Sequence, residues 1–342
     1  MNKEFIFKQC PGFAGCHAAT IAEAGNGDYL AVWFAGTHEG NDDVGIWGSR
    51  RIGNTWREPR QIVKISPEPH WNPVLFNGKN GNLHLFFKVG RVIPTWRTWH
   101  MLSFDNGKNW LAPKELITGD QGGRGPVKNK PIILSNGNFL APGSVEKRKL
   151  WQAFADLSSD GGSTWTRSNL INLPNPEKNG QGVIQPTLWE SVPGHVHMLL
   201  RSSCGRICRS DSVDGGSTWC SAYPISLPNN SSGIDLVKIP DGRLVLICNP
   251  VSDSTIRTPL SIMLSADNGN SWEKFCDVED DDVKVGDIIK QDGGEFSYPS
   301  IIYSEGKVLA VYTWHRHRIA FWEAGVGELS ESLSEQAVFA WG

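Results

Sequence analysis

Short runs in which apolar and polar residues alternate dominate the chain, as in residues 83–87 (Leu-His-Leu-Phe-Phe), and long stretches with apolar residues three and four positions apart are absent. Alternation places successive side chains on opposite faces of a strand, so the pattern predicts strands rather than helices. The 37 glycines and 20 prolines are numerous enough to supply a turn after each run. The pattern therefore predicts an all-β chain.

One eight-residue motif, Ser-x-Asp-x-Gly-x-x-Trp, recurs along the chain at intervals of 53 to 55 residues. Complete copies begin at Ser103, Ser158, Ser212 and Ser265, and a fifth copy at Ser49 lacks the aspartate. In each copy the Asp-x-Gly segment supplies side-chain acceptors and a residue that tolerates a positive φ, and the tryptophan can pack the turn onto a sheet. The motif therefore predicts structural hairpin turns, not catalysis.

A second repeat, in which a glycine turn joins two apolar strands, occurs six times, at Gly27, Gly81, Gly137, Gly194, Gly242 and Gly306. Six such units predict a six-bladed β-propeller. No linker or shift in composition divides the chain, so residues 1–342 are expected to form one domain. The sixth unit has no motif after it. We therefore expect a strand from the other terminus, Glu4–Lys8 or Ala337–Trp341, to close the last blade.

Polar residues begin the predicted innermost strands, whose first residues converge on the axis of a propeller. Four of them precede a proline, namely Asn72, Lys130, Gln185 and Tyr298, and alignment of the repeat adds His17 and Asp235. The second strands end in a further polar set: Thr37, Lys88, Glu146, Arg201, Asn249, and Trp314 with Arg316. These residues together predict a polar pocket of the size of a sugar, although a water-filled structural channel is the alternative.

Composition narrows the classes of function. A net charge of −3 and a pI near 6.3 argue against a nucleic-acid-binding face. No apolar run approaches the ~20 residues of a membrane-spanning helix. The N-terminus lacks a basic segment followed by an apolar one, so a cytoplasmic location is expected, or a secreted one if a signal was removed.

Cysteine and histidine spacing predicts neither a metal site nor another cofactor. Two pairs among the seven cysteines, Cys10 with Cys16 and Cys204 with Cys208, are close enough in sequence to bond. Reduced thiols are the preferred interpretation. The sequence leaves the oligomeric state open.

The repeated Ser-x-Asp-x-Gly-x-x-Trp motif resembles the Asp-box of the sialidase (neuraminidase) superfamily. The chain is similar in particular to a bacterial and plant branch of BNR-repeat proteins. The segments that carry the closer resemblance are 71–75 (Trp-Asn-Pro-Val-Leu), 128–132 (Lys-Asn-Lys-Pro-Ile), 295–299 (Glu-Phe-Ser-Tyr-Pro) and 312–314 (Tyr-Thr-Trp). The resemblance implies that Arg201 and Arg257 bind a substrate carboxylate and that Tyr298 is the nucleophile. It also implies that Asp43, or its neighbour Asp42, is the acid/base.

Two positions depart from the family pattern. His17 replaces the first of three arginines, and histidine lacks the fork with which arginine grips a carboxylate. Gln185 replaces the glutamate that activates the tyrosine, and an amide cannot accept the phenolic proton. Another base is then needed, and Glu146 is a candidate.

Three functions stay open. The first is an exo-acting glycoside hydrolase on a terminal sialic, ulosonic or uronic acid glycoside. The second is a lyase on a uronic-acid linkage such as rhamnose–glucuronate, with His17 and Tyr298 moving the proton. The third is a non-catalytic glycan-binding propeller. The expected partner is in each case a glycan with a carboxylate. The candidate catalytic residues are His17, Asp43, Glu146 and Tyr298, and the candidate binding residues are Asn72, Lys88, Lys130, Gln185, Arg201, Asp235, Arg257, Trp314 and Arg316.

Overall fold

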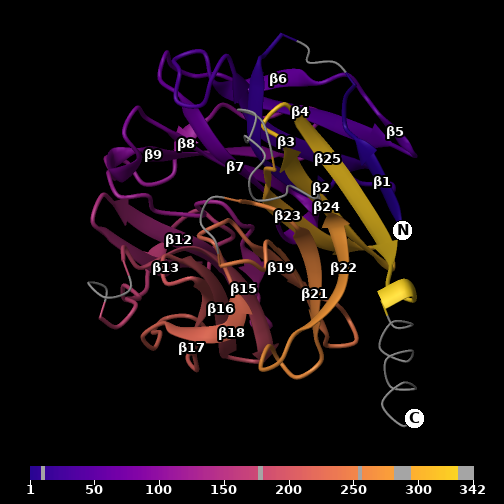
Figure 1. The fold of residues 1–342 in the computed structure, drawn as a ribbon. Helices are drawn as coiled ribbons and strands as arrows, with labels where there is room; N and C mark the ends of the chain where they lie inside the picture. Colours follow the sequence, from indigo (N-terminus) through magenta and orange to yellow (C-terminus); the bar gives the residue numbers. More distant parts are fainter. Residues whose placement is uncertain (9–11, 176–179, 253–255, 281–293, 330–342) are drawn as a thin grey trace.

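The computed structural model describes residues 1–8, 12–175, 180–252, 256–280 and 294–329. Within these ranges the chain forms six antiparallel sheets set around a common axis (Figure 1). The prediction of a six-bladed β-propeller is therefore confirmed. No helix in the described ranges is long and apolar enough to cross a membrane.

The first three blades are built in chain order, each from its inner to its outer strand. Blade 1 contains β2 (Gly15–Glu23), β3 (Tyr29–Gly36), β4 (Gly45–Ile52), β5 (Thr55–Trp56) and β6 (Arg60–Val63), the last of which also pairs with β4. Blade 2 contains β7 (His70–Asn77), β8 (Leu83–Val89), β9 (Arg97–Ser103) and β10 (Lys114–Glu115). Blade 3 contains β11 (Ile132–Ile133), β12 (Phe139–Lys147), β13 (Leu150–Ser158) and β14 (Thr166–Arg167).

The last three blades repeat this order. Blade 4 contains β15 (Val183–Val192), β16 (His195–Ser202), β17 (Arg206–Ser212) and β18 (Tyr223–Pro228). Blade 5 contains β19 (Asp235–Lys238), β20 (Leu244–Cys248), β21 (Leu260–Ser265) and β22 (Glu273–Glu279). Blade 6 contains β23 (Phe296–Ser304), β24 (Lys307–Trp314), β25 (Arg318–Gly325) and β1 (Asn2–Phe5). Two short 3-10 turns, η1 (Lys79–Gly81) and η2 (Ile93–Thr95), lie in blade 2.

The N-terminal strand closes the ring. β1 pairs with β25 from Asn2 opposite Glu323 to Phe5 opposite Ala320, as Figure 1 shows at the edge of blade 6. This confirms the N-terminal alternative, with the strand beginning and ending a little earlier than the expected Glu4–Lys8. The other alternative, residues 337–341, lies outside the described residues.

The Asp-boxes are hairpin turns held by their own side chains. In the second complete copy Ser158 Oγ donates to Asp160 Oδ1 over 2.8 Å, and the Thr164 N–H donates to the same oxygen over 2.9 Å. Trp165 Nε1 donates to the Gly162 carbonyl at 3.0 Å. Hydrogen bonds from the hydroxyl and the N–H of Thr164 and from Ser158 lower the pKa of the Asp160 carboxyl to about 2, because they stabilise its charged form. The boxes are structural, as predicted.

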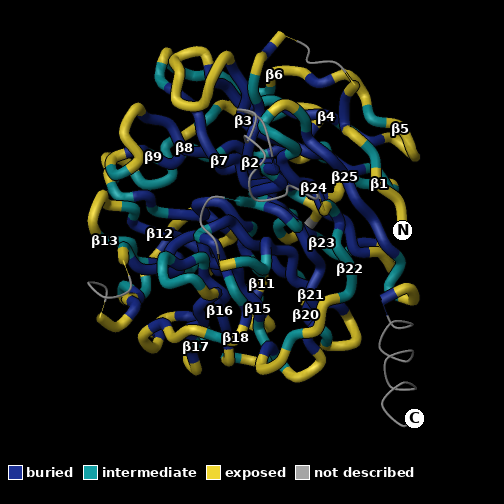
Figure 2. Tube along the Cα trace, viewed as in Figure 1, coloured by how far each residue is buried: buried dark blue, intermediate teal, exposed yellow. Residues whose placement is uncertain are grey.

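The hydrophobic core lies between neighbouring blades. Phe34 of blade 1, for example, packs in one buried cluster with Leu75 and Leu85 of blade 2. Figure 2 shows the buried strands as a continuous inner zone, with exposed residues confined largely to the peripheral turns. The core therefore fixes each blade against the next and leaves the loops at the strand ends for a site.

A shared irregularity marks the start of four innermost strands. Pairing with the second strand slips by one residue after His17, Trp71, Ile184 and Ser297. The residue that follows each of these has a positive φ, with values of 57° at Ala18, 40° at Asn72, 51° at Gln185 and 50° at Tyr298. The true counterpart of Tyr298 in blade 1 is therefore Ala18. The alignment that placed His17 there was wrong by one residue, because no proline marks the position in blade 1.

Lys130 and Asp235 lie deeper along the axis than predicted. Asp235 Oδ1 accepts a hydrogen bond from Thr187 Oγ1 at 2.8 Å, and Thr187 stands two residues beyond Gln185. Lys130 Nζ donates to Asp235 Oδ2 over 2.8 Å, so Lys130 belongs to the same deeper level. The expectation that these two side chains share a level with Gln185 and Tyr298 is corrected. They form a partly buried ion pair that joins blades 3 and 5, in which Asp235 is the fully buried partner.

We expect the substitution Asp235→Asn to lower the free energy of unfolding by about 3–5 kcal/mol, because it leaves the Lys130 ammonium without its buried partner. Asp235 is fully buried and also accepts the Ile301 N–H at 2.9 Å. Urea unfolding measures the change. Asp241→Asn, an exposed site in the same blade, is the control and should change stability by under about 1 kcal/mol. Equal stability of the two variants would contradict a structural role for Asp235.

Candidate active site

Tyr298 lies at the centre of the candidate site, near the start of β23. Its phenolic oxygen accepts hydrogen bonds from Arg201 Nη1 at 3.0 Å and from Gln185 Nε2 at 3.3 Å. Arg201 Nη1 also donates to Gln185 Oε1 at 3.1 Å, which closes a triangle between blades 4 and 6. Both donors stabilise negative charge that develops on the phenolic oxygen. The structure thus brings three of the predicted residues together.

His17 packs against the tyrosine ring. The two ring centroids are 4.3 Å apart, and the side chain of His17 is nearly fully buried. Among the described residues, its Nδ1 atom has no hydrogen-bond partner. Burial, followed by the charges of Arg316 and Arg257, holds the pKa of His17 well below 6.5. The imidazole is therefore neutral at pH 7, and its Nδ1 is a buried polar atom without a hydrogen-bond partner among the described residues.

Three cations surround the same ring. The distance from the Tyr298 ring centroid is 5.8 Å to Arg257 Cζ and 5.9 Å both to Arg201 Cζ and to Lys128 Nζ. Lys128 was not predicted as a site residue. It occupies the level at which Lys130 was expected, and its Nζ donates to Asn129 Oδ1 at 2.8 Å and to the Ile234 carbonyl at 3.0 Å. Burial lowers the pKa of Lys128 to about 7.

Carboxylates neutralise part of this charge. Glu295 Oε1 accepts from Arg257 Nη1 at 2.8 Å, and Glu295 Oε2 accepts from Arg316 Nε at 2.8 Å. Arg316 also pairs with Glu39, which lies on the loop between β3 and β4, called here the blade 1 loop. Despite its burial, Glu295 has a lowered pKa because of the two arginines and a hydrogen bond from Ser297. Glu39 was missed in the sequence, since its partner lies in the last blade.

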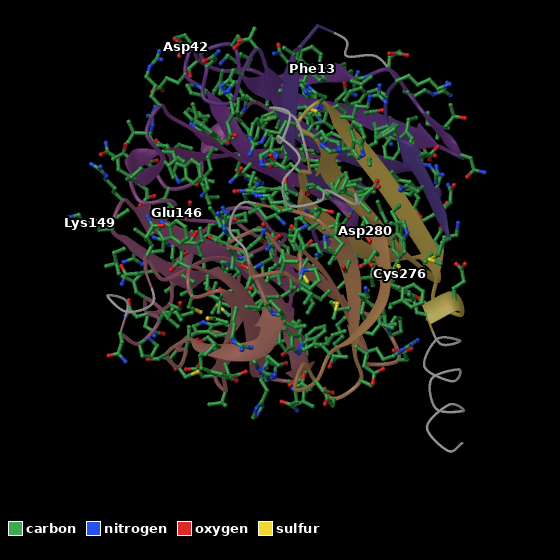
Figure 3. The ribbon with its side chains drawn as sticks, in the orientation of Figure 1. Phe13, Asp42, Glu146, Lys149, Cys276 and Asp280 are labelled. Carbon is green, nitrogen blue, oxygen red and sulfur yellow. The ribbon has the colours of Figure 1, made fainter. Side chains whose placement is uncertain are left out.

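Glu146 lies at the end of β12 and is labelled in Figure 3. It accepts a hydrogen bond from Ser144 Oγ at 2.9 Å, and its carboxylate also interacts with the Gln185 side chain and the charge of Arg201. Burial outweighs these contacts and raises the pKa of Glu146 above its usual value. Gln185 therefore stands between Glu146 and the phenol of Tyr298.

A cavity of about 350 Å³ opens beside His17. Its wall consists of the start of β2, the blade 1 loop and the turn after β24, and includes Phe34, Glu39, Glu295 and Arg316. His17 belongs both to this wall and to the contact with Tyr298. The cavity is thus offset from the tyrosine, and His17 forms the boundary between them.

Asp43 lies on the loop that carries part of the cavity wall. Its carboxylate accepts the Thr37 N–H at 2.7 Å and the Thr37 hydroxyl at 3.0 Å. The adjacent Asp42 pairs with Arg91 at the outer rim, where Figure 3 labels it. Asp43 therefore braces the loop in this structure, and its predicted role as an acid/base stays a prediction.

Three other predicted binding residues have structural partners. Lys88 is fully buried, and its Nζ donates to Thr98 Oγ1 at 2.6 Å and to the carbonyls of Gly123 and Arg124 at 3.0 Å. Lys88 is not among the residues that line the cavity, and its predicted contact with a ligand stays a prediction. Burial lowers the pKa of Lys88 to about 7.

Trp314 packs edge-on against Phe5 with centroids 5.2 Å apart, and Arg318 lies over its ring at 5.8 Å. Trp314 is therefore part of the closure of blade 6 and is not among the residues that line the cavity, and its predicted binding role stays a prediction. Asn72 stays at the expected level, but its Nδ2 donates to the Val127 carbonyl at 3.0 Å and so ties blade 2 to blade 3.

No set of three or more histidine, cysteine, aspartate or glutamate side chains in the described ranges is placed to hold a metal ion. Cys204 and Cys208 have sulfur atoms 3.7 Å apart and are not bonded, as preferred from the sequence. Cys10 lies outside the described residues, so the pairing of Cys10 with Cys16 is not described.

The fold and the arrangement around Tyr298 define a six-bladed propeller of the sialidase-like class. The chain belongs to the BNR repeat-like domain family, whose model matches residues 27–311. Among curated proteins, none has a matching sequence.

Solved structures with the same fold include several sialidases. The Hadza microbial sialidase Hz136 is 16% identical with a TM-score of 0.72, over 92% of this chain and 66% of that one. The Trypanosoma rangeli sialidase in complex with the inhibitor DANA is 17% identical with a TM-score of 0.73, over 99% of this chain and 61% of that one. This chain therefore spans less than two thirds of the length of either sialidase.

A protein of unknown function from Dyadobacter fermentans matches over nearly its whole length. It is 17% identical with a TM-score of 0.73, over 93% of this chain and 96% of that one. Likeness at this level of identity establishes the fold alone.

We expect the imidazole of His17 to stay neutral from pH 8 to about 6.5, because burial and the surrounding cations hold its pKa well below 6.5. The His17 Cε1 resonance, assigned with a His17→Gln variant, should not move over this range in the folded protein. In urea-unfolded protein it should titrate near pH 6.5. The folded-state pKa is the lower one, so stability from His17 is full above about pH 6.5 and is lost as the pH falls. A folded-state midpoint near 6.5 would contradict this prediction.

Proposed function

We propose that the protein is an exo-acting glycoside hydrolase that acts on a terminal acidic sugar, such as a sialic, ulosonic or uronic acid glycoside. The observation that carries the proposal is the phenolic oxygen of Tyr298, held by Arg201 and Gln185 next to a neutral histidine. A lectin site rarely needs so many ionisable groups with shifted pKa values at one point.

In this reaction Tyr298 attacks the anomeric carbon and the glycosidic C–O bond breaks, which leaves a tyrosyl–sugar bond that water then hydrolyses. Arg201 and Gln185 stabilise the phenolic oxygen as its proton leaves. His17 and Glu146 are the candidate bases, and Asp43 is the candidate donor to the leaving oxygen. Arg201, Arg257 and Lys128 supply positive charge for the carboxylate of the sugar.

A second function, elimination at a uronic-acid linkage, is favoured by one observation. Neutral His17 has an unpartnered Nδ1 and lies against the phenol of Tyr298, so a base and an acid stand side by side. The two reactions differ in product. Hydrolysis releases a saturated sugar, whereas elimination leaves an unsaturated uronate that absorbs ultraviolet light.

We expect Tyr298→Phe to lower kcat/KM by about 10²-fold or more on the accepted substrate, since it removes the oxygen that Arg201 and Gln185 hold. The substrate panel contains a sialoside, an ulosonic acid glycoside, rhamnosyl-glucuronate and uronic oligosaccharides, with free sugar and ultraviolet absorbance both followed. Tyr303→Phe, the same change on the same strand, is the matched control and should retain activity. Glycan that binds but stays intact with every substrate would contradict both enzymatic functions.

The substitution Gln185→Glu separates hydrolysis from elimination. A glutamate at this position can accept the phenolic proton, so a hydrolase with a tyrosine nucleophile should gain about tenfold in kcat, or 1.4 kcal/mol. An elimination in which Tyr298 donates a proton should instead become slower, because the new carboxylate competes for that proton. Steady-state kinetics of the variant on the accepted substrate distinguish the two outcomes.

A further inference from the structure

The hairpin that joins β16 to β17 carries two cysteines with adjacent sulfur atoms. Cys204 Sγ and Cys208 Sγ are 3.7 Å apart. Cys204 is partly exposed in the turn, whereas Cys208 is fully buried in β17 among the core residues of blade 4. A disulfide needs the sulfur atoms at about 2.05 Å, so a small movement of the turn is enough to form one.

Free space allows the turn to move. Gly205, between the two cysteines, has a φ of 79°, and a side chain built on it would meet no atom within 4 Å. The surface beside it is hollowed into a pocket of about 410 Å³. Cys204 lines this pocket together with Arg206, Tyr223 and apolar residues, so a small molecule can reach its sulfur.

Arg206 gives the pocket its charge. Its side chain is exposed and its Nη1 donates to the Ser226 carbonyl at 2.9 Å, and it is the charged residue among those that line the described wall. An exposed guanidinium attracts anions. The pocket is therefore suited to a small molecule that carries carboxylates.

We propose that Cys204 and Cys208 form a reversible dithiol–disulfide pair that exchanges with a small disulfide carrying carboxylates. The Cys204 thiolate attacks one sulfur of that disulfide and expels a thiolate, which gives a mixed disulfide. Cys208 then attacks Cys204 Sγ as its own proton leaves, and the second small thiol departs. One disulfide is thereby reduced to two thiols, and the two cysteines are oxidised to one disulfide.

The order in which the two cysteines react follows from their surroundings. Burial raises the pKa of the Cys208 thiol to about 12, so Cys208 is a poor first nucleophile. Cys204 lies at the surface and meets the external disulfide first. Closure is then intramolecular, with the second sulfur already in contact.

The pair is linked to the candidate active site through the same hairpin. Ser202 Oγ lies 3.1 Å from Cys204 Sγ and directly follows Arg201. On the other side of the turn, the Gly182 N–H donates to Ser203 Oγ at 2.9 Å, just before the strand that carries Gln185. Movement of the turn therefore reaches both residues that hold the phenol of Tyr298.

The test measures mass and so does not depend on the proposed function. Reduced full-length protein is incubated with excess oxidised glutathione at pH 8, quenched with acid and digested with trypsin, which cleaves after Arg206 between the two cysteines. In the wild type the two peptides that contain Cys204 and Cys208 should be joined by a disulfide and weigh two hydrogens less than the two free peptides together. Cys208→Ser should stop with one glutathionyl group on Cys204. Cys220→Ser, in the same blade, should react as the wild type does.

A wild-type protein that stays reduced, or that keeps a glutathionyl group on Cys204 without closure, would overturn the proposal. The charge of the partner is tested with cystamine, a cationic disulfide. Oxidised glutathione should react about tenfold faster than cystamine, and Arg206→Gln should abolish this difference. Faster reaction with cystamine would refute the preference for carboxylates.

Discussion

The left-handed backbone at the start of the inner strands is the constraint on which the candidate site depends. Gln185 and Tyr298 have φ values of 51° and 50°, a conformation that costs a non-glycine residue about 1–3 kcal/mol. Two contacts one level deeper hold these strands in place, from Thr187 and from the Ile301 N–H to Asp235. Because that buried layer fixes the strands, their first polar side chains meet at 3.3 Å instead of relaxing apart.

The number and order of the blades could be predicted from the sequence because each blade carries its own local signals. A glycine turn and an Asp-box act within a few residues, so their spacing is readable without knowledge of the rest of the molecule. The depth of a side chain along the propeller axis cannot be predicted from such local signals, since it depends on contacts between blades. A proline marks the start of an inner strand only loosely. Lys130, which precedes Pro131, lies two positions deeper than the residue at the level of Tyr298, which is Lys128. Blade 1 has no proline at the corresponding position. Lys128 escaped notice because its acceptors, such as the Ile234 carbonyl, come from other blades.

Internal pairing changes what the cations at the site can do. Arg257 and Arg316 both bind Glu295, so a ligand carboxylate must compete with a carboxylate that the protein already holds there. Arg201 differs, because its hydrogen-bond partners in the described ranges are the neutral side chains of Gln185, Tyr298 and Ser231. A partly buried cation with neutral partners gains most from an incoming anion. These contacts support the proposal that Arg201 anchors the acidic sugar, because Arg257 and Arg316 are already held by Glu295.

The position of His17 connects this anchor to the cavity. One side of the imidazole faces the Tyr298 ring at 4.3 Å, and the same residue forms part of the cavity wall with Glu39 and Glu295. In the proposed function, a glycan whose acidic end lies on Arg201 and whose remainder fills the cavity places its glycosidic linkage next to His17. Both hydrolysis and elimination need a proton to move at that linkage, and a neutral imidazole can accept one there. In the proposed function, a histidine at the position where the sialidase pattern has an arginine exchanges a fixed charge for a group that moves protons, at the point where the two parts of the site meet.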